Sequence, residues 1–165
     1  MNWRELLTRI LENKKDQPRF RSKPTFFPPA ASAGIKELES SLNTRIPSSL
    51  QSLLQETNGV MEMLSIDGGE WSNDLWLIWP IEEIIKENLF FRSEREKGVY
   101  EREFDQLVFF TSAGCDGILF AHSINQDRVA EPHVLVWHPI EDELAEIART
   151  LKDFIEGWCT GKISV

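Results

Sequence analysis

The sequence contains only two cysteines, Cys115 and Cys159, and neither belongs to a C-x-x-C pair or lies at zinc-finger spacing from histidine. We expect both to be reduced thiols that serve in packing. No apolar run approaches the roughly 18 residues that cross a bilayer, and charges interrupt residues 1–15, where a signal peptide needs an apolar stretch. These absences predict a cytoplasmic protein without a membrane partner.

Signals of catalysis are also scarce. The gap between His133 and His138 fits zinc-finger spacing, but it spans a predicted strand, and the remaining histidine, His122, brings no cysteine pair. Gly68-Gly69 lacks the strand-loop-helix context and the lysine of a phosphate-binding loop. Cys115 has no paired histidine or oxyanion hole marked nearby. We therefore expect neither an enzyme nor a cofactor or metal site.

Charge is divided unevenly along the chain. Residues 1–23 hold seven Lys/Arg and three Asp/Glu, a net of +4, which leaves −13 on the other 142 residues to give the overall −9. An acidic surface repels nucleic acid and attracts basic protein partners. Many soluble proteins are acidic merely to stay soluble, so the charge alone leaves both interpretations open.

The first half of the chain predicts helices joined by an arm. Residues 3–11 have apolar side chains on one helix face. Residues 14–29 contain four prolines and five basic residues, so we expect an extended arm without regular structure, pinned to the core by its phenylalanines Phe20, Phe26 and Phe27. Residues 34–59 then predict a helical hairpin in which Pro47 opens the second helix and Asn58-Gly59 closes it.

The second half alternates strands and helices. We expect a strand at 75–79, a helix from Pro80 and an exposed loop or frayed helix end at 92–105. The buried stripe of the helix from Pro80 comprises Ile81, Ile84, Ile85 and Leu89. Further strands are predicted at 107–111, 117–122 and 133–137, and a last helix at 144–158. The order predicts an α+β fold, one domain over residues 1–165, with helices packed around a mostly antiparallel sheet.

This series resembles the SUKH superfamily, which includes a fungal cell-wall assembly regulator and many bacterial immunity proteins. The residues that carry the resemblance are Ile35, Leu38-Glu39, Leu42, Ile46-Pro47, Leu50, Leu53-Leu54 and Asn58-Gly59. The resemblance continues through Leu75–Leu89, Leu107–Phe120, Val134–Trp137 and a closing helix at 144–161. It covers residues 26–161, preceded by a helix and basic arm at 1–25. The sequence departs from the family at Cys115 and at Ala121-His122.

The resemblance implies a bacterial immunity protein that binds and neutralises a cognate toxin, and an acidic inhibitor suits a basic, nuclease-type toxin. The alternative is a non-enzymatic scaffold or regulatory adaptor of the cell-wall-regulator type. A compact chain without long disordered tails favours the first. We expect no nucleic acid partner and a monomer or weak homodimer.

Aromatic and acidic residues suggest where a partner binds. Trp71, Trp76 and Trp79 cluster around Asp67, Glu70 and Asp74, and Trp76 and Trp79 should point to opposite faces of a regular strand. We expect partner binding at Asp67, Glu70, Trp71, Asp74 and Asp116, because tryptophan anchors interfaces and carboxylates steer basic partners. Each tryptophan also has a core-packing interpretation, and Asp116 also fits a plain turn. The next choice is Glu143, Glu146 and Asp153.

Overall fold

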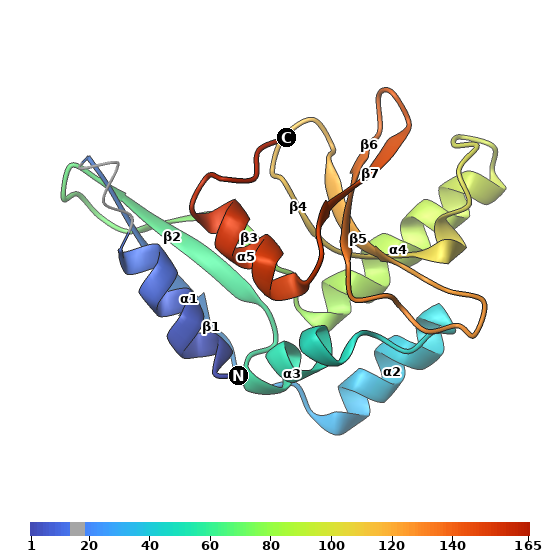
Figure 1. Cartoon of the computed structure of the whole chain (residues 1–165), viewed down its shortest axis with the longest axis horizontal. Helices are drawn as coiled ribbons and strands as arrows, with labels where there is room; N and C mark the ends of the chain where they lie inside the picture. Colours follow the sequence, from blue (N-terminus) through green and yellow to red (C-terminus); the bar gives the residue numbers. More distant parts are fainter. Residues whose placement is uncertain (14–18) are drawn as a thin grey trace.

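The computed structural model describes residues 1–13 and 19–165, so residues 14–18 of the predicted arm lie outside the described residues (Figure 1). The elements in order are α1 Trp3–Glu12, β1 Phe20–Phe26, α2 Ser32–Leu42, α3 Ser48–Glu56, β2 Val60–Ile66, β3 Ser72–Ile78, α4 Ile81–Glu96, a 3-10 turn η1 Phe104–Gln106, β4 Leu107–Ser112, β5 Leu119–Ser123, β6 Val134–His138, β7 Glu143–Ala148 and α5 Leu151–Cys159. This arrangement confirms the predicted α+β class.

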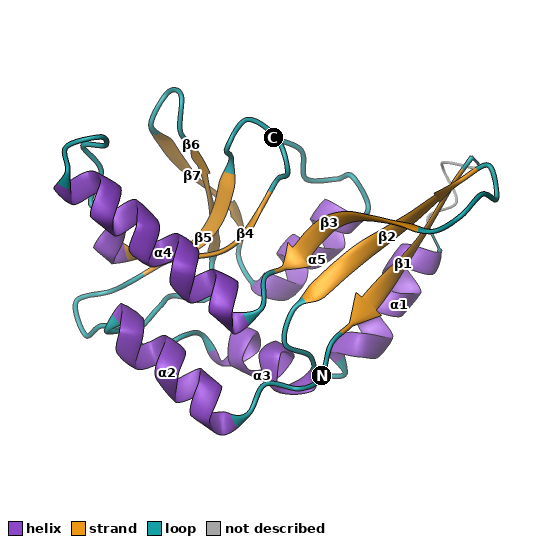
Figure 2. Ribbon diagram, turned by 180° about the vertical axis from the view of Figure 1, so that it is seen from behind, coloured by secondary structure: helices purple, strands orange, loops and turns teal. Residues whose placement is uncertain are grey.

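The strands form two antiparallel sheets, with orders β1-β2-β3 and β4-β5-β6-β7. The sheets meet where β3 ends beside β4. There the Trp79 amide donates to the Phe110 carbonyl (3.0 Å), and the Thr111 hydroxyl donates to the Trp76 carbonyl (2.8 Å). Figure 2 shows α1 behind the three-stranded sheet and no helix over the front of that sheet. One sheet is thus covered on one side only.

Helix α4 is attached to β4 through a buried asparagine. Asn88, 1% exposed, donates to the Phe109 carbonyl (2.7 Å) and accepts from the Phe109 amide (2.9 Å). These bonds satisfy the backbone of Phe109 where β4 departs from regular pairing with β5. The rings of Phe91, Phe104 and Trp137 pack against one another and against the Phe109 ring, with centroids 4.9–5.8 Å apart. The junction combines buried aromatic rings with an asparagine whose side-chain donor and acceptor groups are both hydrogen-bonded.

The predicted helical hairpin is present as α2 and α3, but its end differs from the expectation. Helix α3 ends at Glu56, and Thr57 is extended rather than left-handed. Instead, the side-chain Oδ1 of Asn58 accepts a hydrogen bond from the Ile81 amide (2.9 Å). The backbone N–H of Asn58 donates to the Pro28 carbonyl (3.0 Å). Because Pro80 has no side-chain acceptor, Asn58 supplies the N-terminal cap of α4.

The prediction of an arm without regular structure is wrong for Phe20–Phe26, which form β1 and pair with β2. Pro24 fits because β1 is an outer strand and its missing N–H costs no ladder bond on the solvent side. Strand β2 was also not predicted from the sequence. Of the phenylalanines expected to pin the arm, Phe26 and Phe27 are half-buried, whereas Phe20 is exposed.

The last helix is shorter than predicted, because Glu143–Ala148 form β7, which pairs with β6. The segment ELAEIA fits a strand as well as a helix, and pairing with β6 decides the outcome. Helix α5 begins at Leu151, where the Thr150 side chain accepts from the Asp153 amide (3.1 Å). The threonine therefore marks the real N-terminus of the helix.

The segment expected to be exposed after residue 92 is largely structured. Helix α4 continues to Glu96, and Phe104 is buried at 2% exposure. In the stripe of α4, Leu89 is 43% exposed, and its neighbour Asn88 is buried instead. Cys159 is buried as expected, but Cys115 is exposed and does not serve in packing.

We predict that Gly59→Ala lowers the free energy of unfolding by about 2 kcal/mol or more. Gly59 has φ +95°, and an added Cβ would lie 3.0 Å from Pro80 N and 3.0 Å from Trp76 Cζ3. The matched control is Gly98→Ala, which also has positive φ (+80°) but open space around the new Cβ. Urea unfolding measures both variants, and equal losses would contradict a steric requirement at Gly59.

Candidate functional site

The β2–β3 loop carries three of the five expected site residues, and Figure 1 places it at one end of the molecule. Asp67 occupies a left-handed turn position (φ 50°). Its carboxylate accepts two hydrogen bonds from Arg19, at 3.0 and 2.8 Å. This bidentate contact lowers the pKa of Asp67. Asp67 is therefore exposed but paired with Arg19 rather than presented as a free charge.

Trp71 lies beneath positive charge. Lys23 Nζ is 4.2 Å and Arg21 Cζ 5.6 Å from the indole centroid, and both cations come from β1. Such contacts are worth about 0.5–1 kcal/mol at exposed sites. The pairing of β1 with β2 thus brings the basic arm onto the loop that the sequence marked as acidic. Sequence reasoning missed this contact because it did not predict β1 or β2.

The other expected carboxylates are exposed. No ion pair joins Glu70, Asp74 or Asp116 to another side chain within residues 1–13 and 19–165. Asp116 has positive φ (51°) in the β4–β5 turn, as its turn interpretation predicts. That turn approaches β3, since a Cβ added to Gly114 would lie 2.7 Å from Leu75 Cδ1. We name Asp67, Glu70, Trp71, Asp74 and Asp116 the acidic edge, because they follow β3 from the loop to this turn.

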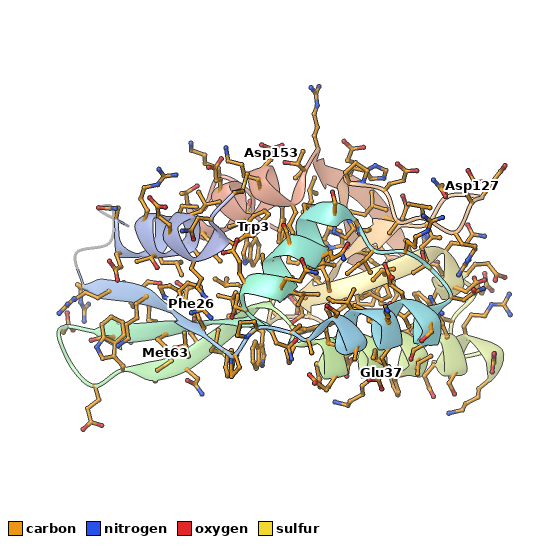
Figure 3. The ribbon with its side chains drawn as sticks, turned by 90° about the horizontal axis from the view of Figure 1, so that it is seen from below. Trp3, Phe26, Glu37, Met63, Asp127 and Asp153 are labelled. Carbon is orange, nitrogen blue, oxygen red and sulfur yellow. The ribbon has the colours of Figure 1, made fainter. Side chains whose placement is uncertain are left out.

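The uncovered side of the three-stranded sheet carries a second surface that sequence reasoning missed. Directly paired residues share one face, and the pairs Lys23–Met63, Thr25–Met61 and Met61–Trp76 define that face. Figure 3 labels Met63 on the side of the strands away from α1. We name this surface the open face, comprising Arg21, Lys23, Thr25, Met61, Met63 and Trp76. An alternating strand pattern in residues 60–63 was the available signal.

A hollow of about 480 Å³ continues the open face beyond Trp76. Its walls are mainly apolar: Phe27, Pro28, Pro29, Ala30, Ala31, Gly34, Trp76, Pro80 and Ile81, with Asn58 and Glu82 as polar members. The Phe27 and Trp76 rings lie 5.1 Å apart at its border. Trp79, in contrast, is buried. Trp76 on β3 and Trp79 just after the strand therefore differ in exposure, as expected, and Trp76 is the one that reaches the surface.

The three histidines do not assemble a metal site. His122 Nδ1 donates to the His133 carbonyl (2.9 Å), and His133 Nε2 lies 2.9 Å from the Ser123 hydroxyl. His138 ends β6. In the described part of the chain, no group of three His, Cys, Asp or Glu side chains could hold a metal ion. Nor does any described helix have the length and apolar character needed to span a membrane.

The next-choice residues are divided between two elements. Glu143 and Glu146 are exposed on β7, the outer strand of the four-stranded sheet. Asp153 lies in the first turn of α5, where its carboxylate accepts from the Thr150 hydroxyl (2.7 Å). The three carboxylates expected on one helix therefore have different surroundings.

The fold defines the class of the protein first: a helical hairpin, Asn58-Gly59 and antiparallel strands within an α+β architecture. A family model described as the SMI1 / KNR4 family (SUKH-1) matches residues 29–157. The chain belongs to this family, which confirms the superfamily indicated by the sequence. No curated protein matches the chain.

The buried histidine predicts a pH dependence of stability. His122 is 0% exposed and stacks on Phe110 (4.8 Å), and Nε2 has no hydrogen-bond partner within the described residues. Burial lowers the pKa of His122 to about 4. The unfolded chain, with an ordinary pKa of about 6.5, therefore binds the proton more tightly. The folded state, which holds His122 neutral, therefore has its full stability above about pH 6.5. It loses part of that stability as the pH falls from about 6.5 toward about 4, because the unfolded chain takes up the proton first.

We predict that the His122 contribution falls by about 2 kcal/mol between about pH 7.5 and about pH 5. Urea unfolding at both pH values measures the loss. The control is His122→Phe, which keeps a buried ring but cannot titrate, so its stability should fall less over the same range. An equal fall in both proteins would show that His122 is not the titrating group.

Proposed function

We propose that the protein is a bacterial immunity protein that binds a cognate toxin through the acidic edge and blocks its activity. The toxin is a basic protein of the nuclease type. This role agrees with membership of the SMI1 / KNR4 family (SUKH-1), because the wider SUKH superfamily includes many immunity proteins. Inhibition requires a protein–protein contact and no chemical step on the inhibitor.

The observation that carries the proposal is the exposure of Glu70, Asp74 and Asp116 along one margin of the molecule. Unpaired surface carboxylates raise the encounter rate with a basic partner through their long-range field. Trp71 adds an aromatic surface beside them, held by Lys23 and Arg21. Such a ring loses little conformational entropy when a partner covers it.

Asp67 has a different part in the proposed interface. Its two hydrogen bonds to Arg19 fix the β2–β3 loop against the segment before β1. A basic toxin would compete with Arg19 for this carboxylate, so we assign Asp67 to loop positioning and Glu70 and Asp74 to steering. Arg19 thereby neutralises the charge of Asp67 but leaves the negative charges of Glu70 and Asp74 available to a partner.

We predict that Glu70→Lys combined with Asp74→Lys slows association with the toxin by about tenfold at low salt. The toxin is the product of a gene adjoining the one that encodes this chain. Surface plasmon resonance at two salt concentrations gives both rate constants. The control is Glu37→Lys with Asp127→Lys, which makes the same change in net charge at two exposed carboxylates, on α2 and in the β5–β6 loop beside it.

Equal rate constants for the acidic-edge variant and the unmodified protein would move the interface elsewhere, with Glu143, Glu146 and Asp153 the next choice. Equal slowing in both variants would show that net charge, rather than this surface, governs the encounter. If no toxin gene adjoins and the protein captures several unrelated cytosolic proteins, the adaptor function replaces the immunity function.

A further inference from the structure

The open face has an apolar middle and is not covered by any other element among the described residues. Helix α1 packs on the opposite side of the sheet, as the position of Arg4 over the Phe26 ring (5.1 Å) shows. Met61, Met63 and Trp76 are half-buried and adjacent. Contiguous apolar patches of this kind mark interaction surfaces, and methionine adapts its shape to a partner.

The two ends of the open face carry opposite charges. Lys23 pairs with Met63 at one end, and Arg21 lies two residues before it. At the other end Glu82 borders the hollow, where the Asn58 amide group donates to its carboxylate (3.3 Å). Five residues of extended chain separate Met63 from Asn58, roughly 17 Å. The surface is therefore positive at one end, apolar in the middle and negative at the other.

We propose that the open face binds a second copy of this chain in a two-fold symmetric dimer. In a two-fold dimer both copies use the same surface, so that surface must be complementary to itself. If residue i of one copy contacts residue j of the other, the same contact occurs again with the two copies exchanged. An axis in the plane of the interface, crossing the strands near Met61, lays the Lys23 end of each copy over the Glu82 end of the other. The charge distribution satisfies this requirement.

The alternative two-fold axis, parallel to the strands, is unfavourable. It would place Lys23 against Lys23 and Glu82 against Glu82, and like charges repel. The crossing axis also lays Trp71 of one copy over the hollow of about 480 Å³ in the other. A tryptophan in an apolar pocket is a typical centre of binding energy.

This dimer goes beyond the proposed immunity function, because its contacts centre on Met61 and Trp76 rather than on the exposed carboxylates. The two surfaces adjoin at Trp71. Among the residues changed in the test, Met61 and Glu82 lie outside the acidic edge, whereas Lys23 also packs on the Trp71 ring. Loss of dimerisation in the Met61 and Glu82 variants can therefore be measured separately from loss of toxin binding.

The test is sedimentation equilibrium of the full chain from micromolar to millimolar concentration. Lys23→Glu and Glu82→Lys should each raise the dimer dissociation constant by about tenfold, because each turns two symmetry-related attractions into repulsions. The double variant Lys23→Glu with Glu82→Lys should regain most of the affinity lost in each single variant, since the reversed charges again meet opposite charges; the lost contact between Lys23 and Trp71 is not restored. Thermal unfolding of every variant checks that the fold is kept.

Matched controls are Lys36→Glu and Glu37→Lys, which make the same charge changes at exposed positions on α2. Met61→Lys places two like charges beside the axis and should abolish the dimer. A protein that stays monomeric at millimolar concentration overturns the proposal. So does a dimer that is insensitive to Met61→Lys, or a double variant that remains as weak as the single ones.

Discussion

Asn58 ties together segments that are far apart in the sequence, and the arrangement of the first sheet depends on it. Its backbone N–H donates to the Pro28 carbonyl, and its side chain accepts from the Ile81 amide and so caps α4. The side chain can do this because it is short and carries both an acceptor, which receives the Ile81 amide, and donors, one of which binds the Glu82 carboxylate. The next residue, Gly59, lies where backbone atoms of Ile78 and Pro80 approach closely. The hairpin, the sheet and α4 consequently share one fixed point.

From that point the chain builds two sheets with different coverage. Asn88 binds both backbone groups of Phe109, so α4 packs closely on β4, and the aromatic rings around Trp137 fill the space between them. In Figure 2, α1 lies behind the three-stranded sheet, and no helix of the described residues covers its front. The difference in coverage produces the open face, and the four-stranded sheet gains most of the aromatic core. The proposed binding surface and the aromatic core thus lie at opposite ends of one fold.

The distribution of charge also follows from strand pairing. The sequence separates a basic N-terminus from an acidic remainder, but β1 lies beside β2 and brings Arg19 and Lys23 to the loop that carries Asp67 and Trp71. Local charge at this loop is therefore mixed. The unpaired carboxylates are left along β3 and the β4–β5 turn, which is why the proposed toxin contact lies at that margin.

The sequence by itself determined the helical hairpin, the strands β4, β5 and β6, and the family. Apolar periodicity over residues 35–54 indicates helices, whose hydrogen bonds join residues close in sequence, so the local sequence is enough to specify them. The sequence around residue 116 also indicated the turn conformation of Asp116. These features need no knowledge of which segments meet.

Only the tertiary structure decided β1, β7 and the function of Asn58 as a cap. Residues 20–26 contain a proline, and residues 143–148 fit helix or strand, so each becomes a strand because a neighbouring strand supplies its hydrogen bonds. The cap joins residues 58 and 81, and the cation contacts join residues 23 and 71. Such pairings depend on packing between distant segments, which no local pattern in the sequence records.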